Sequence, residues 1–83
     1  MQFFTGVMYV MYDGREFPAI RFYEAKNEAH ALSMQHEDAR TWVCDEQPEI
    51  DNKGYWFEAQ AWLVYPQSIR AISEATYREI QQK

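Results

Sequence analysis

Two runs rich in β-branched and aromatic residues open the chain and meet at a turn. The runs cover residues 2–12 and 15–24, and between them lies Asp13-Gly14, the preferred sequence for a two-residue type I′ hairpin. This turn predicts three opposing pairs, Val10–Phe17, Met8–Ala19 and Tyr9–Pro18. The amide of residue 18 would point away from the first strand, and proline has no amide proton. The second strand is therefore predicted to form a sheet edge, with the first strand inside the sheet.

Both faces of this hairpin are apolar. One face carries Phe4, Met8, Val10, Tyr12, Phe17, Ala19 and Tyr23, and the other carries Phe3, Val7, Tyr9, Met11, Ile20 and Phe22. Gly6 indicates either a bulge or a close contact within the first strand. Two short helices can cover one face of a small sheet but not both, so the second face is expected either to be an interface or to hold half-buried aromatic side chains with hydrated polar tips.

Helical spacing begins at Asn27, which is predicted to cap a helix with an apolar stripe of Ala29, Leu32, His36 and Ala39. Residues 41–44 are β-prone and are interpreted either as a short strand or as a continuation of the helix. Residues 45–54 contain Pro48 and end in Asp-Asn-Lys-Gly, which favours a loop or a wide hairpin connection.

Residues 55–65 alternate along one predicted long strand. One face would carry Tyr55, Phe57, Ala59, Ala61, Leu63 and Tyr65, and the other Trp56, Glu58, Gln60, Trp62 and Val64. Pro66 is then expected to open a helix of about fourteen residues with Ile69, Ile72, Thr76 and Ile80 inward, and with Arg70, Glu74 and Arg78 outward. The prediction is a single α+β domain over 1–83, with an antiparallel sheet of three to four strands and two helices in the order ββα(β)βα.

Composition agrees with a compact, soluble protein. Of the 83 residues, 47% are hydrophobic and 17% aromatic, which excludes a disordered chain. The single cysteine, Cys44, allows no intrachain disulfide, so we expect a buried thiol and a cytoplasmic location. The apolar N-terminus lacks the features of a signal peptide and is too short to span a bilayer, so no membrane association is predicted.

The charge of the chain is confined to one segment. Residues 37–51 hold six acids and one base, whereas the remainder holds seven acids and seven bases, which gives the net charge of −5. This balance opposes direct binding to duplex DNA. The acidic segment is either a solvated loop or a docking surface for a partner protein with a basic surface, such as the groove of a nucleic-acid-handling protein.

The residues that could perform chemistry form no recognisable motif. His30, His36, Asp38, Cys44 and Asp45 are the candidate metal ligands, but the two histidines are six residues apart, where helical ligand pairs use three or four. Glu58 is a lone carboxylate, and the chain has no phosphate-binding glycine loop and no nucleophile elbow. We therefore expect no metal, no cofactor, no catalytic residue and no enzymatic activity.

The plan of the chain resembles a class of small viral proteins. A strand runs into a helix through Phe22-Tyr23-Glu24-Ala25 and Glu28-Ala29-x-Ala31 in a short acidic α+β chain, and in this plan the protein is similar to phage-encoded anti-defence inhibitors, anti-CRISPR proteins among them. The resemblance covers the general plan and no diagnostic motif, so no functional residue is carried over. It implies a stoichiometric inhibitor that binds a host nucleoprotein without chemistry.

The sequence thus predicts a non-enzymatic, acidic protein-binding domain that inhibits or regulates a nucleic-acid-handling complex. The predicted partner-binding residues are the acids and the tryptophans, Glu37, Asp38, Asp45, Glu46, Glu49, Asp51, Trp42, Trp56 and Trp62. The alternatives are a homodimeric accessory protein and a single-stranded nucleic-acid-binding module in which bases stack on the sheet aromatics.

Overall fold

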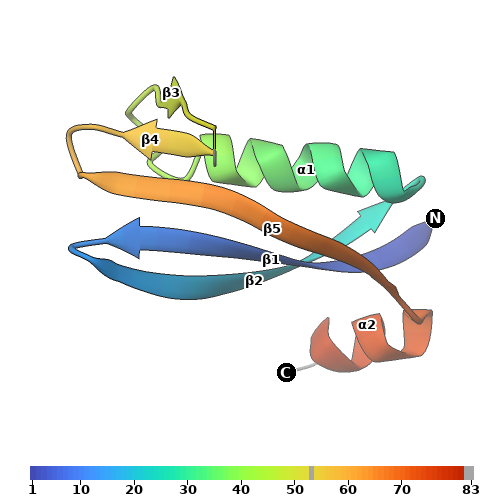
Figure 1. Cartoon of the computed structure of the whole chain (residues 1–83). Coiled ribbons are helices and arrows are strands. Elements are labelled where there is room, and N and C mark those ends of the chain that lie inside the picture. Colours follow the sequence, from blue (N-terminus) through green and yellow to red (C-terminus); the bar gives the residue numbers. More distant parts are fainter. Residues whose placement is uncertain (53, 82–83) are drawn as a thin grey trace.

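The computed structural model, which describes residues 1–52 and 54–81, is a five-stranded antiparallel sheet with helices on opposite sides (Figure 1). The elements are β1 (Gln2–Tyr12), β2 (Arg15–Ala25), α1 (Glu28–Arg40), β3 (Glu49–Ile50), β4 (Tyr55–Phe57), β5 (Trp62–Ile72) and α2 (Glu74–Gln81). The strands lie in the order β2-β1-β5-β4-β3. The α+β class is confirmed, but the predicted three to four strands are too few, and the element order is ββαβββα.

The N-terminal hairpin has the predicted register. Asp13 and Gly14 have φ values of 53° and 72°, the left-handed pair that a type I′ turn requires. Tyr9 pairs with Pro18, as expected, and β2 forms one edge of the sheet while β1 lies between β2 and β5. Proline at position 18 therefore removes no ladder hydrogen bond.

The predicted long strand over 55–65 is wrong, because the chain turns back on itself within it. β4 ends at Phe57 and β5 begins at Trp62, and the Ala61 amide donates to the Glu58 carbonyl at 3.2 Å across the turn. Phe57 pairs directly with Trp62, so these two side chains share a face. Trp56 and Trp62 consequently lie on opposite faces, not on the same face as predicted.

Pro66 does not open a helix but lies inside β5, which continues to Ile72. Met8 pairs with Pro66 while Val7 pairs with Ser68, so the residue between these two is the extra residue of a β-bulge. Beyond Val64, no described strand pairs with the other side of β5, and this edge tolerates a proline. The predicted inward stripe is also wrong, since Ile69 and Ile72 belong to the strand.

The second helix is short and is capped by a serine. α2 begins at Glu74, and the Ser73 hydroxyl oxygen accepts from the Thr76 amide at 3.1 Å. Of the predicted outer row, Glu74 and Arg78 form a solvent-exposed ion pair at 3.3 Å. No residue of α2 is buried.

The first helix has the predicted start but a different buried stripe. The Asn27 side chain accepts from the His30 amide at 2.8 Å, which confirms the N-cap. The buried residues are Ala31, Gln35 and Ala39, whereas Leu32 is 43% exposed. α1 ends at Arg40, and residues 41–44 form a turn instead of a strand or further helix. Cys44 is exposed, contrary to the buried thiol expected.

Gln35 joins the helix to the bulge. Its Nε2 atom donates to the carbonyls of Val7 at 3.1 Å and Ser68 at 2.8 Å, two groups at the register shift between β1 and β5. A Cβ atom at Gly6 would lie 2.7 Å from this nitrogen, so glycine permits the close approach of the Gln35 side chain. Apolar clusters lie under α1, built from Met8, Val10, Ala39, Phe57 and Val64 and from Phe4, Tyr23, Ala25 and Ala31. The buried glutamine thus aligns the helix on the sheet.

Candidate protein-interaction surfaces

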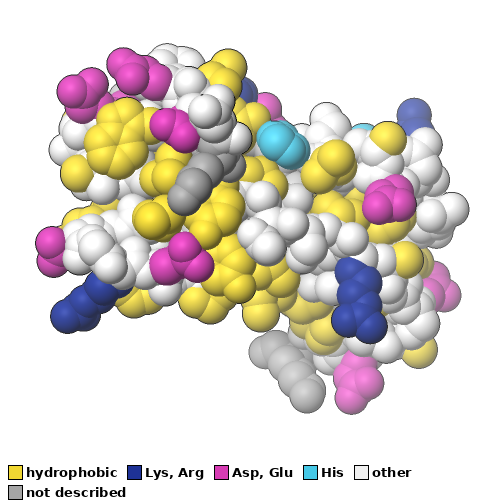
Figure 2. Space-filling model, in the orientation of Figure 1, with side chains coloured by type: hydrophobic (Ala, Val, Ile, Leu, Met, Phe, Trp, Pro, Cys, Tyr) yellow, Lys and Arg dark blue, Asp and Glu magenta, His cyan; other side chains and the backbone are white. Residues whose placement is uncertain are grey.

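The sheet has a face that α1 leaves uncovered. α1 packs over β5, β2 and β1 on one side, where the apolar clusters lie. On the other side α2 reaches one end, where the Tyr77 ring lies 4.6 Å from that of Phe3. The pairing register places a set of large apolar side chains on this side, which we call the open face: Val7, Tyr9, Met11, Ile20, Phe22, Trp56, Leu63 and Tyr65. Hydrophobic side chains form a visible band across the middle of the molecule in Figure 2.

One row of the open face crosses all five strands. The register aligns Glu49 of β3, Trp56 of β4, Leu63 of β5, Met11 of β1 and Glu16 of β2. An apolar row with a carboxylate at each end is suited to a partner that has an apolar patch flanked by basic groups.

The next row contains two stacked tyrosines. The rings of Tyr9 and Tyr65 lie 5.7 Å apart, and the Tyr65 hydroxyl donates to Glu16 Oε2 at 2.7 Å. This hydrogen bond raises the pKa of Tyr65 to about 12. Glu16 therefore holds the exposed edge of the open face in a defined arrangement.

The six acids predicted to bind a partner are distributed over α1 and the segment that follows it, β3 included. Asp45, Glu49 and Asp51 are exposed, and acidic side chains gather at the end of the molecule that carries β3 and β4 (Figure 2). Glu46 has a structural contact instead, because its Oε2 atom accepts from the Ala59 amide at 3.0 Å in the β4–β5 turn. The other two, Glu37 and Asp38, lie on α1.

The three tryptophans are also separated. Trp56 lies on the open face beside Leu63 and Met11, where all three line a hollow of about 280 Å³. Trp62 packs against the core on the α1 side, and Trp42 packs there too, with the Arg21 guanidinium 4.9 Å from its ring. The structure therefore brings Glu49 and Trp56 together and leaves Trp42 and Trp62 elsewhere.

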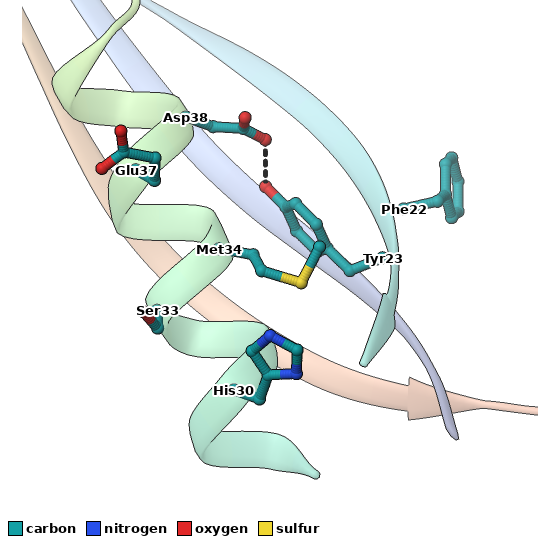
Figure 3. A pocket seen from close by; sticks show the side chains of 7 residues that line it. All are labelled: Phe22, Tyr23, His30, Ser33, Met34, Glu37 and Asp38. Atoms are coloured by element: carbon teal, nitrogen blue, oxygen red, sulfur yellow. Dashed lines mark hydrogen bonds between the residues drawn. The ribbon is translucent and has the colours of Figure 1, made fainter. Parts of the chain in front are cut away.

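A groove between β2 and α1 is a second candidate surface. One hollow of about 550 Å³ is lined by Phe22, Tyr23, His30, Ser33, Met34, Glu37 and Asp38 (Figure 3), and a second of about 320 Å³ by Arg21, Asp38, Thr41 and Trp42. Asp38 lines both hollows, so the two are adjacent, and we refer to them together as the groove. Figure 3 shows Met34 and Asp38 of α1 facing Tyr23 of β2, while the Phe22 ring points away from the helix.

The Tyr23–Asp38 hydrogen bond is the polar centre of this groove. The Tyr23 hydroxyl donates to Asp38 Oδ2 at 2.7 Å, and burial together with this carboxylate raises the pKa of Tyr23 above its usual range. Among the described residues Asp38 has no salt bridge, so its charge is uncompensated at contact distance. Glu37, by contrast, accepts from Arg40 Nε at 3.0 Å, and this contact lowers the pKa of Glu37.

Sequence analysis missed the groove. The signal was available, because the predicted edge strand is followed at once by a helix, so one flank of the helix must lie beside the edge. The prediction instead placed Leu32 in the inward stripe. A helix oriented with Leu32 inward would be rotated about its axis, and the side that carries His30 and Glu37 would no longer lie where the structure has it.

The described residues contain no group of three His, Cys, Asp or Glu side chains that could hold a metal ion. None of the described helices has the length and apolar character needed to cross a bilayer. Comparison with known proteins gives no significant match to a family model, to a curated protein or to a solved structure.

Proposed function

We propose that this chain is a non-enzymatic protein-binding domain, and that it inhibits or regulates a nucleic-acid-handling partner by docking its open face on a basic surface of that partner. The observation that carries the proposal is the row from Glu49 through Trp56, Leu63 and Met11 to Glu16, an apolar strip between carboxylates.

The apolar side chains supply the binding energy in this proposal. Large aromatic residues dominate protein interfaces, and truncating a central tryptophan commonly costs about 2 kcal/mol or more of binding free energy. Trp56 is partly buried and lies beside Leu63, so it is held in place before a partner arrives. A preformed side chain loses little entropy on binding.

The acids favour a basic partner over a second copy of the chain. Among the described strand residues, the open side of the sheet carries the acids Glu16, Glu24 and Glu49 and the base Arg70. A symmetric dimer would bury this acidic excess twice over, whereas a partner with a basic rim would neutralise it. Carboxylates can also occupy a site that otherwise binds phosphates, which supports a nucleic-acid-handling partner.

The test is capture of partners from a host lysate on the immobilised chain, followed by binding measurements with the recovered protein. Trp56→Ala removes the central anchor, and Leu32→Ala is its control because Leu32 is an exposed apolar residue on α1. We expect Trp56→Ala to weaken binding at least about tenfold. Leu32→Ala should bind as the unaltered chain does.

A second variant tests the electrostatic part. It combines Asp45→Asn, Glu49→Gln and Asp51→Asn, and it leaves Glu46 in place because that carboxylate supports the β4–β5 turn. The salt dependence of binding should become shallower in this variant. Recovery of a stable homodimer without any partner, disrupted by Trp56→Ala, would contradict the proposal and support a self-associating protein.

A further inference from the structure

The outer edge of β2 has unused hydrogen-bonding groups. Tyr12 and Arg15 flank the two-residue turn and form the closing hydrogen-bonded pair, so alternate residues of β2 direct their backbone groups away from β1. The outward residues are Glu16, Pro18, Ile20, Phe22 and Glu24. The Ile20 carbonyl accepts from Arg21 Nη1 at 3.2 Å, and no hydrogen bond occupies the outward amides of Ile20, Phe22 and Glu24 in the described structure. Pro18 blocks pairing towards the hairpin tip.

The groove between β2 and α1 runs along this same edge. Its α1 side is lined by residues between His30 and Asp38 on the helix and by Thr41 just after it, a span of about 16 Å at the helical rise per residue. An extended chain covers that distance with about five residues. The groove is thus long enough for one short added strand and lies where the side chains of such a strand would project.

We propose that the β2 edge and its groove bind an extended peptide segment of a partner protein as a sixth, antiparallel strand, and that this segment alternates apolar residues with lysine or arginine. The proposal goes beyond the proposed function because it concerns the backbone edge of β2 and the groove, and not the row of the open face that contains Trp56. It can hold even if that row binds nothing.

The alternation follows from the two environments beside the edge. Ile20, 55% exposed, and Phe22 direct their side chains to the open side of the sheet, so partner residues opposite them would add apolar contacts there. The intervening partner residues would point into the groove. There the aliphatic part of a lysine or arginine side chain would pack against Met34, and its positive charge would lie near the Asp38 carboxylate. Arg21 lies at the other end of the groove and would repel a second positive charge, so the basic residue of the partner is expected at the Met34 end.

The probe for this site is a capped six-residue peptide that alternates valine and lysine, added to the isotopically labelled chain. Binding is expected to shift the amide resonances of Ile20, Phe22 and Glu24 and to slow their exchange with water, because these amides gain partners. The methyl resonance of Met34 should shift with them, while that of the buried Met8 stays unchanged.

Two N-methylated forms of the peptide test strand pairing directly. In the proposed antiparallel pairing the valine amides face β2 and the lysine amides face away. Methylation of the backbone nitrogens of the valines is expected to weaken binding at least about tenfold. Methylation of the backbone nitrogens of the lysines should change the affinity by no more than about threefold. Equal effects of the two forms would overturn the proposal.

Variants of the chain provide the matching evidence. Ile20→Pro removes one outward amide at a position equivalent to that of Pro18, and Ile20→Ala keeps the amide while shortening the side chain. Ile20→Pro should abolish the shifts, whereas Ile20→Ala should retain them at a higher peptide concentration, because it loses part of the side-chain contact and keeps the amide. Circular dichroism and denaturation should confirm that both variants fold. Asp38→Asn should weaken binding of the lysine peptide about threefold or more and leave binding of an alternating valine and serine peptide unchanged.

Two further results would overturn the inference. One is the absence of shifts at β2 with millimolar peptide. The other is a dimer in size exclusion with light scattering that Ile20→Pro dissociates, since the edge would then pair with the β2 edge of a second copy. A lost interaction at Trp56 affects the proposed function alone, so the failures of the two proposals can be told apart.

Discussion

The two faces of the sheet contrast in how they are covered and in what covers them. On the α1 side, Met8, Phe57 and Val64 are fully buried, and Gln35 reaches the backbone of two strands. On the opposite side, α2 contributes the contact of Tyr77 with Phe3 and buries none of its own residues. Burial of apolar area is the main source of stability. The contrast indicates that one face holds the fold together while the other leaves apolar side chains partly exposed.

The largest expected difference between the two faces is in the unfolding free energy that is lost when a side chain is truncated in the core or on the open side. Phe57→Ala removes a fully buried ring and is expected to cost about 3–5 kcal/mol of unfolding free energy. Ile20→Ala, at a residue 55% exposed, should change it by about 0.5 kcal/mol or less. Chemical denaturation measures both values. Similar losses at the two positions would show that the open face is part of a covered core.

Gln35→Leu tests whether the polar contact at the bulge is structural. The substitution leaves the Val7 and Ser68 carbonyls without their donor, and we expect a loss of about 2 kcal/mol. The exposed Gln60→Leu in the β4–β5 turn is the control, with a change of about 0.5 kcal/mol or less. A stabilised Gln35→Leu variant would mean that burial of Gln35 Oε1, which has no hydrogen-bond partner among the described residues, costs more than the two Nε2 hydrogen bonds contribute.

Tyr77→Ala tests how loosely α2 is attached to the open side. Loss of the ring contact with Phe3 is expected to cost about 0.5–1.5 kcal/mol and to speed amide exchange in α2 more than in β1. Arg78→Gln breaks only an exposed ion pair on the same helix and should have a smaller effect. Exchange that accelerates equally in α2 and β1 would instead identify α2 as part of the cooperative core.

The smallest expected effect is a change in titration at the edge of the open face. Glu16 raises the pKa of Tyr65 to about 12 from the ordinary 10.0. Because the pKa is raised in the folded state, the associated stability is present in full below pH 10.0 and is lost as the pH rises through about 12. Glu16→Gln should lower the pKa of Tyr65, as followed by NMR of the tyrosine ring carbons. An unchanged value would exclude the hydrogen bond in solution.

Local chemistry made the hairpin and the first helix predictable. Asp-Gly specifies a tight turn, Pro18 excludes an interior position for β2, and Asn27 caps α1, and each of these signals depends on near neighbours in the chain. The break at residues 58–61 carried no such signal. The segment Glu-Ala-Gln-Ala lacks glycine, proline and asparagine, and it continues the alternation, although Ala61 has a φ of 56°.

The candidate interaction surfaces were predictable only in part for the same reason. The pairing of Glu49 with Trp56 agrees with the expected carboxylates beside an aromatic patch, but the unpredicted turn moved Trp62 to the other face. Pro66 was misinterpreted because a proline before a helical pattern is common. The strand tolerates this proline because of the neighbouring bulge and because β4 is too short to pair with β5 at residue 66. Gln35 was missed because a buried amide is recognised by the carbonyls that it meets, and those lie far away in sequence.

The four methionines allow the most direct test of the contrast between the two faces. Met8 is fully buried under α1, Met11 lies on the open face, Met34 lines the groove, and Met1 is 72% exposed. Relaxation of the methyl resonances by a soluble paramagnetic agent can be measured in the dilute free chain and again with the captured partner. We predict strong relaxation of Met1 and Met11 and none of Met8, with Met11 becoming protected in the complex. Protection of Met11 equal to that of Met8 in the dilute free chain would contradict an open face.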